Sequence, residues 1–250
     1  MMLARTFCAA RSSPRSRFMS ASAQPANRGV IKGVIFDMDG TLTMPVIDFT
    51  EMRRRCGVLT GDVLDTIAGW PADKQHAANQ AIKDVEDEAL VRMQLMPGLL
   101  ELCSFLESKH VPRGLVTRNV DTSVKYFHDK HFTLTPFWPA LSRDFKPYKP
   151  NPGALLHICQ QWSIMPQEAI MIGDSARDDV VAGNRAGMGT ILLDTTGAYV
   201  DQSSLQGDMK PTHIVSSLAQ ICKLLQHEYS CQGTANITGP VTATPTESSS

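Results

Sequence analysis

Short apolar runs alternate along the chain with segments whose apolar residues recur at helical spacing. The runs that predict strands are residues 30–36, 114–117, 169–172, 190–193 and 213–215. The amphipathic segments between them are residues 99–109, 120–130, 152–162, 177–186 and 218–226. Nearly continuous apolar strands that alternate with helices are typical of a parallel sheet covered on both faces. The pattern therefore predicts an α/β fold of this kind.

Residues 45–96 interrupt the alternation. This stretch has almost no strand-like run, and residues 72–95 read as one long charged helix. Its charges, with Glu88 and Arg92 four residues apart, are typical of a solvent-exposed helix face. We expect a small helical subdomain at 45–96, inserted into a core made of residues 30–44 and 97–227.

The N-terminal segment differs from the rest of the chain in composition. It has no acidic residue before Asp37, and arginine recurs in it among serine and alanine. This is the composition of an organellar transit peptide, which we assign to residues 1–23. The segment favours a mitochondrial destination, with the chloroplast as the alternative and the cytosol if it is not a transit peptide.

The C-terminal residues 228–250 are polar and nearly free of aliphatic side chains, so they predict a disordered tail. The whole chain of 250 residues has a formal net charge of −1. Without a basic stripe it offers nucleic acid no electrostatic footprint. It also lacks an apolar run of about 18 residues, the minimum for a transmembrane helix. We therefore expect neither nucleic acid nor membrane as a partner, while monomer and dimer both remain open.

Polar residues follow the predicted strands at the edge where open α/β sheets bind ligands. They come from separate segments of the chain, and together they supply carboxylates, a hydroxyl and cations. The candidate site residues are Asp37, Asp39, Thr117, Arg118, Asn119, Lys149, Asp174, Asp178 and Asp179.

This combination meets the needs of phosphoryl transfer. A phosphate dianion repels an attacking carboxylate, so a divalent cation and a lysine must neutralise charge. Hard oxygen ligands suit Mg²⁺, and we assign it to Asp37 and Asp174 with help from the Asp39 carbonyl. Asp37 is the candidate nucleophile. Asp39 is the candidate acid and base, which protonates the leaving oxygen and later activates water.

The remaining candidates would bind substrate. Thr117 and the amides after it, including that of Asn119, would hold phosphate oxygens. Lys149 would grip the phosphate as a point charge. Arg118 is either a substrate contact or an exposed loop arginine.

The same residues carry a resemblance to a known family. DMDGT from Asp37, GLVT ending at Thr117, KPNP from Lys149 and GDSARDD, which contains Asp174, are similar in order and spacing to the motifs of the haloacid dehalogenase superfamily. The resemblance implies a Rossmann-like core, Mg²⁺, an aspartyl-phosphate mechanism and a cap that corresponds to residues 45–96.

The alignment with this family leaves two positions open. Either Asp178 or Asp179 can be the second acid of the last motif, and the register with Gly187 favours Asp179. Lys146 is an alternative to Lys149, although a lysine before Pro-x-Pro at the start of a helix matches better.

Asp39 narrows the predicted reaction, because family members that release halide lack an acid at this position. We predict a Mg²⁺-dependent phosphatase that hydrolyses a small-molecule phosphate monoester through an aspartyl-phosphate. The alternatives are a phosphomutase of the same superfamily and a non-catalytic module that binds or accepts phosphate.

Overall fold

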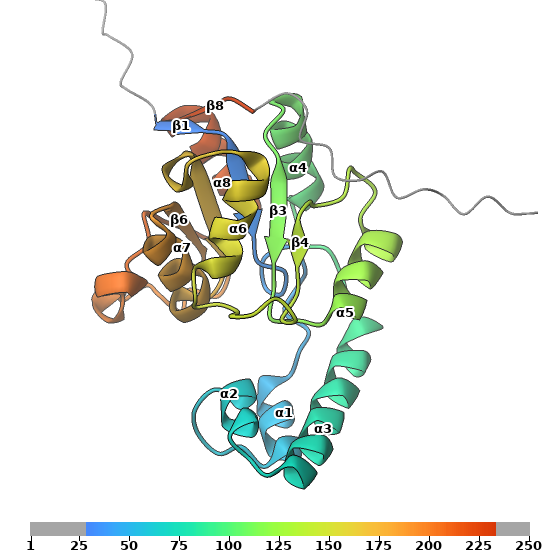
Figure 1. The fold of residues 1–250 in the computed structure, drawn as a ribbon. Helices are drawn as coiled ribbons and strands as arrows, with labels where there is room; N and C mark the ends of the chain where they lie inside the picture. Colours follow the sequence, from blue (N-terminus) through green and yellow to red (C-terminus); the bar gives the residue numbers. More distant parts are fainter. Residues whose placement is uncertain (1–28, 234–250) are drawn as a thin grey trace, which may run out of the picture.

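A parallel sheet of six strands forms the centre of the computed structural model, which describes residues 29–233 (Figure 1). Its order is β4-β3-β2-β5-β6-β7. The strands are β2 (Gly33–Phe36), β3 (Arg113–Val116), β4 (Ala140–Leu141), β5 (Ala169–Gly173), β6 (Gly189–Leu193) and β7 (His213–Val215).

The strand order reverses at β2. The chain adds β3 and β4 on one side of β2 and then crosses to the other side for β5, β6 and β7. Val34 of β2 therefore lies between Arg113 of β3 and Ile170 of β5. Such a reversal leaves a crevice beyond the carboxyl ends of the central strands. Asp37 directly follows β2, so it stands at this crevice.

Helices cover both faces of the sheet. One face carries α4 (Leu99–Ser108), α5 (Asp121–Tyr126), the π-helical turn η1 (Phe127–His131) and α8 (Leu218–Glu228). The other carries α6 (Gly153–Trp162) and α7 (Val181–Ala186). The remaining turns are η2 (Pro166–Glu168), η3 (Ala176–Val180), η4 (Gln202–Ser204) and η5 (Gly207–Met209). The predicted α/β fold with a doubly covered parallel sheet is confirmed.

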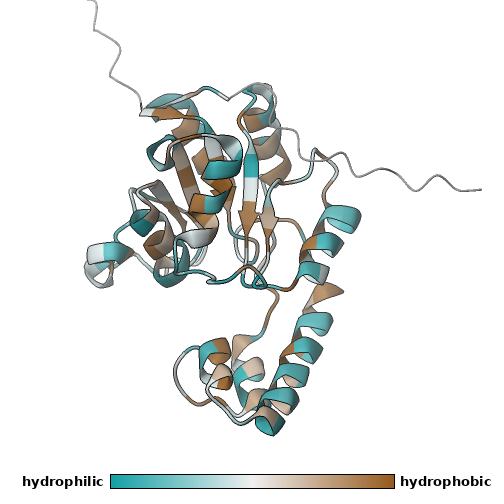
Figure 2. Ribbon diagram, viewed as in Figure 1, coloured by the Kyte–Doolittle hydropathy of each residue, from teal (hydrophilic) through white to brown (hydrophobic). Residues whose placement is uncertain are grey.

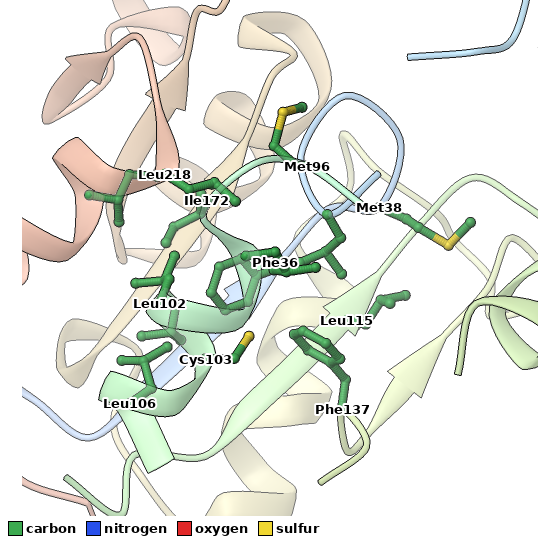
Figure 3. Close-up of a cluster of buried hydrophobic side chains, with 14 of the residues drawn as sticks. Phe36, Met38, Met96, Leu102, Cys103, Leu106, Leu115, Phe137, Ile172 and Leu218 are labelled. Atoms are coloured by element: carbon green, nitrogen blue, oxygen red, sulfur yellow. The ribbon is translucent and has the colours of Figure 1, made fainter. Parts of the chain in front are cut away.

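Successive side chains of β2 explain why both faces need cover. Val34 and Phe36 belong to the core on the α4 and α8 side, whereas Ile35 belongs to the core on the α6 side. Figure 3 shows Phe36 among Leu102 and other fully buried side chains. Burying one such side chain contributes about 1.5–3 kcal/mol. Figure 2 shows the same arrangement, with apolar strands inside and polar helix surfaces outside.

The segment 45–96 forms a helical lobe beyond the ends of β3 and β4, which we call the cap (Figure 1). It consists of α1 (Phe49–Cys56), α2 (Val63–Ala68) and α3 (Ala72–Leu90). Met52, Ile67 and Ile82 belong to an apolar cluster of the cap's own. All three helices lie within residues 45–96, and the long helix ends at Leu90 and not near residue 95.

The first predicted strand was too long, and the C-terminal tail begins with structure. Residues 30–36 are divided at Lys32, whose backbone N–H donates to the carbonyl of Glu168 at 2.7 Å. The part before Lys32 is β1 (Gly29–Ile31), which pairs in parallel with β8 (Tyr229–Cys231). The prediction of disorder from residue 228 is thus wrong for β8, because its backbone groups find partners in β1.

Two other predictions concern residues beyond the described range. The assigned transit peptide, residues 1–23, and the tail from residue 234 onward both lie outside residues 29–233. Within that range, none of the helices is both long enough and apolar enough to cross a bilayer.

Candidate active site

Lys149 lies between two carboxylates at the end of the central strand. Its Nζ is 2.6 Å from Oδ1 of Asp37 and 2.6 Å from Oδ1 of Asp179. The lysine is only 2% exposed. Burial acts to lower the pKa of Lys149, but the charges of Asp179 and Asp37 outweigh it and raise that pKa. Lys149 is therefore a fixed positive charge beside the candidate nucleophile.

Three carboxylates gather around this lysine. Oxygens of Asp37, Asp174 and Asp179 all lie within 4.8 Å of one another. Burial, then repulsion from Asp37 and Asp179, raises the pKa of Asp174 to about 8. Burial also raises the pKa of Asp179 to about 7, with Lys149 opposing and Asp37 adding to the rise. A divalent cation relieves such repulsion, and an all-oxygen donor set is the kind that Mg²⁺ prefers, so these residues fit the metal.

Two glycines leave space for these acids. A Cβ on Gly40 would lie 2.1 Å from Oδ2 of Asp174, and Gly40 also has a φ of +75°. A Cβ on Gly173 would lie 2.1 Å from Oδ2 of Asp179. Any side chain at these positions would displace a carboxylate. The missing side chain thus makes room for an acid at both glycines, and Gly40 in addition has a positive φ.

Asp39 faces the same cleft two residues after Asp37. Burial is the main cause that raises the pKa of Asp39 to about 7, followed by the charges of Asp37 and Glu86. The side-chain amide of Asn119 donates a hydrogen bond to Oδ2 of Asp39. Asn119, expected to bind phosphate through its backbone, therefore also holds Asp39 in place through its side chain.

Thr117 and Arg118 both line the cleft, but their hydrogen-bond partners differ. The buried Thr117 accepts a hydrogen bond at Oγ1 from the backbone N–H of Asn119, at 3.0 Å. Arg118 donates to Asp62 of the cap at 2.7 Å and to Asp178 at 3.2 Å. The Arg118 guanidinium is thus occupied by carboxylates of this chain, and it connects cap and core.

The structure separates the two adjacent acids of the last motif. Ser175 caps the turn η3 by accepting at its hydroxyl from the N–H of Asp178. The turn directs Asp179 inward, where it meets Lys149 and accepts from the backbone N–H of Ser175 at 3.0 Å. Asp178 turns instead to Arg118. The predicted preference for Asp179 agrees with this geometry, whereas Asp178 lies outside the cluster of three carboxylates.

A cleft of about 340 Å³ between cap and core contains all nine predicted site residues. The core supplies its polar floor. The cap supplies a mainly apolar wall made of Ile47, Phe49, Met52, Val63, Leu64 and Ile82. This volume suits a small molecule bound with its polar end against the core.

Four charged residues of the cleft were not anticipated from the sequence, namely Arg53, Asp62, Glu86 and Arg143. Glu86 of α3 forms an ion pair with Arg143, a residue of the loop after β4, at 2.5 Å. Glu86 lies four residues after Ile82 and is 7% exposed, on the buried face of a helix whose other charges face solvent. A carboxylate on the apolar face of a helix needs a partner when it is buried. The position of Glu86 in the sequence could therefore have indicated a buried ion pair.

Comparison with known proteins agrees with this geometry. A family model described as HAD-hydrolase-like matches residues 148–221. The haloacid dehalogenase-like hydrolase domain-containing protein of Arabidopsis thaliana is 43% identical over 241 residues, which cover 91% of this chain and 97% of the relative. A phosphoglycolate phosphatase of Chromobacterium violaceum is 26% identical, covering 79% of this chain and 97% of the relative.

A solved structure with a similar fold is a predicted phosphoglycolate phosphatase from Haemophilus somnus. The TM-score is 0.60 at 19% identity, and the match covers 78% of this chain and 98% of that one. It supports the fold, including the Rossmann-like arrangement. With the extensive similarity to the Arabidopsis protein and an acidic cluster at the expected edge of the sheet, the family is established: this chain belongs to the haloacid dehalogenase-like hydrolases.

Proposed function

We propose that this protein is a Mg²⁺-dependent phosphatase that hydrolyses a small phosphate monoester through an aspartyl-phosphate on Asp37. The observation that carries the proposal is the contact of Lys149 with both Asp37 and Asp179, 2.6 Å in each case, under an enclosing cap. A buried ammonium beside a carboxylate nucleophile is what attack on a dianion requires. The similarity to phosphoglycolate phosphatases supports a phosphate ester as the substrate class.

The metal would be held by Asp37, Asp174 and Asp179, the three acids that lie within 4.8 Å of one another. When bound, Mg²⁺ supplies positive charge that offsets the phosphate dianion and the carboxylates around it. Lys149 adds a fixed charge that cannot dissociate with the metal. Thr117, buried at the end of β3, supplies a hydroxyl to a phosphate oxygen.

The first step transfers the phosphoryl group to the protein. A carboxylate oxygen of Asp37 attacks phosphorus, and the bond from phosphorus to the ester oxygen breaks. Asp39 gives its proton to that oxygen, so the alcohol leaves neutral. The hydrogen bond from Asn119 holds Asp39 in position for this transfer.

The second step returns Asp37 to its starting state. Asp39, now ionised, takes a proton from a water molecule that attacks phosphorus. The bond between phosphorus and the Asp37 oxygen breaks, inorganic phosphate leaves, and Asp39 is again protonated. The apolar wall of the cap limits other water molecules in the cleft, which favours both proton transfers.

Phosphate release from p-nitrophenyl phosphate tests the proposal. We expect Mg²⁺-dependent release that EDTA abolishes and added Mg²⁺ restores. Asp37→Asn should reduce the rate by about a thousandfold or more. The matched control is Asp129→Asn, which removes an exposed carboxylate paired with Lys125 and should leave the rate unchanged. Full activity of Asp37→Asn, or of the EDTA-treated protein, would contradict the proposal.

A hexose phosphate distinguishes the phosphatase from the alternative activities. Isomerisation of the substrate without release of phosphate would indicate a mutase. Absence of turnover on a panel of phosphate esters, with phosphate still binding, would indicate a non-catalytic module. The phosphatase proposal predicts free phosphate as the product.

A further inference from the structure

Most of the cations that line the cleft are neutralised by carboxylates of the protein. Lys149 contacts Asp37 and Asp179, as described above. Arg118 is paired with two acids, one in the cap and one in the core, and Arg143 is paired with Glu86. The Arg118–Asp62 and Arg143–Glu86 pairs also connect cap and core. The charges of all three cations are therefore already compensated.

Arg53 is different. It lies on α1 of the cap and lines the same cleft. Its Nη2 donates to the carbonyl of Gly61 at 2.7 Å, a neutral partner. Among the residues that the structure describes, no carboxylate forms an ion pair with Arg53. A guanidinium has five N–H donors, so most of the hydrogen-bonding capacity of Arg53 remains available to a ligand.

The position of Arg53 separates it from the phosphate site. The nucleophile Asp37 and the phosphate-binding Lys149 both belong to the core. Asp37 stands at the end of β2, and Lys149 stands in a loop beside it. Arg53 belongs to the cap, where it is half-buried and lines the cleft next to Met52 of the apolar wall. A cation without an ion-pair partner attracts an anion, and the planar fork of a guanidinium matches a carboxylate through two parallel hydrogen bonds.

We propose that Arg53 binds a carboxylate of the substrate, so that the substrate is a small phosphate ester that also carries a carboxylate group. The inference rests on the proposed phosphatase function. The phosphate lies against the core, and the carboxylate lies against the cap. Arg53 thereby selects among phosphate esters and takes no part in the transfer itself.

Two substrates that differ only at the distal group test this inference. Phosphoglycolate ends in a carboxylate, and hydroxyethyl phosphate ends in a hydroxymethyl group. The wild type should prefer phosphoglycolate in kcat/KM. Arg53→Gln should reduce kcat/KM for phosphoglycolate by about ten- to a hundredfold, mainly through KM, because a charge-assisted contact is lost. The same variant should change kcat/KM for hydroxyethyl phosphate by less than about threefold. Arg53→Lys should restore part of the preference for phosphoglycolate.

A second substitution on α1 provides the matched control. Arg54→Gln removes an exposed arginine that pairs with Glu51 and does not line the cleft. It should leave both substrates unaffected. Equal losses for both substrates in Arg53→Gln, or a wild type without preference, would overturn the inference, because Arg53 would then serve cap structure or phosphate binding alone.

Binding measurements separate this inference from the proposed function. Phosphonopropionate and hydroxypropylphosphonate replace the ester oxygens of the two substrates by methylene groups and cannot be hydrolysed. Calorimetry should show tighter binding of phosphonopropionate to the wild type, and loss of that difference in Arg53→Gln. If p-nitrophenyl phosphate releases no phosphate, the proposed function fails, yet this comparison still decides the role of Arg53. Equal affinity of the wild type for both phosphonates would reject it.

Discussion

Glu86 on the cap helix α3 forms a largely buried ion pair with Arg143 in the loop that follows β4. The two side chains are 8% and 19% exposed, and both line the cleft. Burial raises the pKa of Glu86, while the charge of Arg143 opposes that rise. The pair therefore holds the cap against the core. The negative charge of Glu86 also contributes to the raised pKa of Asp39.

Removing one partner of this pair should destabilise the protein. Glu86→Gln leaves the Arg143 charge in the cleft without a partner, and we expect a loss of about 3 kcal/mol in the free energy of unfolding. Arg143→Gln should behave similarly, whereas the double variant should lose less than the sum of the two. Urea denaturation measures all three.

Lys83→Gln on the same helix is the control for this prediction. It breaks a pair with Asp87 in which both side chains are more than half exposed. Exposed pairs of this kind contribute about 0.2–1 kcal/mol at most. If Lys83→Gln lowered the free energy of unfolding as much as Glu86→Gln, the buried pair would contribute no more to stability than an exposed one.

Gly40→Ala should damage the proposed metal site more than the fold. The new Cβ would meet the carboxylate of Asp174, and Gly40 also has a positive φ. We expect roughly a hundredfold loss of activity from displacement of this acid and weaker Mg²⁺ binding. Gly207→Ala is the control, since Gly207 has a φ of +58° but a Cβ added there would meet nothing within 4 Å. Like Gly40→Ala, it should lower the free energy of unfolding by about 1 kcal/mol because of the positive φ. Unlike Gly40→Ala, it should keep full activity.

Lysine substitutions decide between the two candidates of the third motif. Lys149→Met removes the ammonium that two buried carboxylates contact. We expect activity to fall by at least about a hundredfold, because the phosphate then meets uncompensated negative charge. Lys146→Met should be nearly neutral, since Lys146 lies over the ring of Tyr148, 4.0 Å from its centre, and does not line the cleft. The reverse order of effects in a phosphate-release assay would assign the role to Lys146.

The acidic cluster predicts how pH affects the metal-free protein. The pKa values of Asp174 and Asp179 are raised to about 8 and about 7, so the folded state binds more protons than the unfolded state between pH 4 and those values. Stability should therefore fall as pH rises through this window. Mg²⁺ replaces these protons, so the increase in melting temperature on adding Mg²⁺ should be larger at pH 8 than at pH 5. Thermal unfolding measures this, and a pH-independent increase would contradict the assignment.

Much of the fold and site could be predicted from the sequence, because the relevant signals are local. Apolar runs locate β3, β5, β6 and β7, and the polar residues after them lie at one edge, since the strands are parallel. Asp37, Thr117 and Asp174 all line one cleft for this reason.

The features that could not be predicted depend on contacts between distant segments. Strand β4, Ala140–Leu141, is too short to leave a pattern in the sequence. Strand β8 is polar and exists because β1 offers it backbone partners. The register with Gly187 favours Asp179, but the π-helical turn η3 that separates it from Asp178 is not revealed by ordinary helical spacing.

Chemical trapping of the phosphorylated residue tests the central claim most directly. The protein is mixed with Mg²⁺ and p-nitrophenyl phosphate, quenched in acid during turnover, and treated with borohydride, which reduces an acyl phosphate of aspartate to homoserine. Peptide mass spectrometry should find homoserine at position 37 and an unmodified residue at Asp39. Turnover with no homoserine at position 37, or with homoserine elsewhere, would contradict Asp37 as the nucleophile.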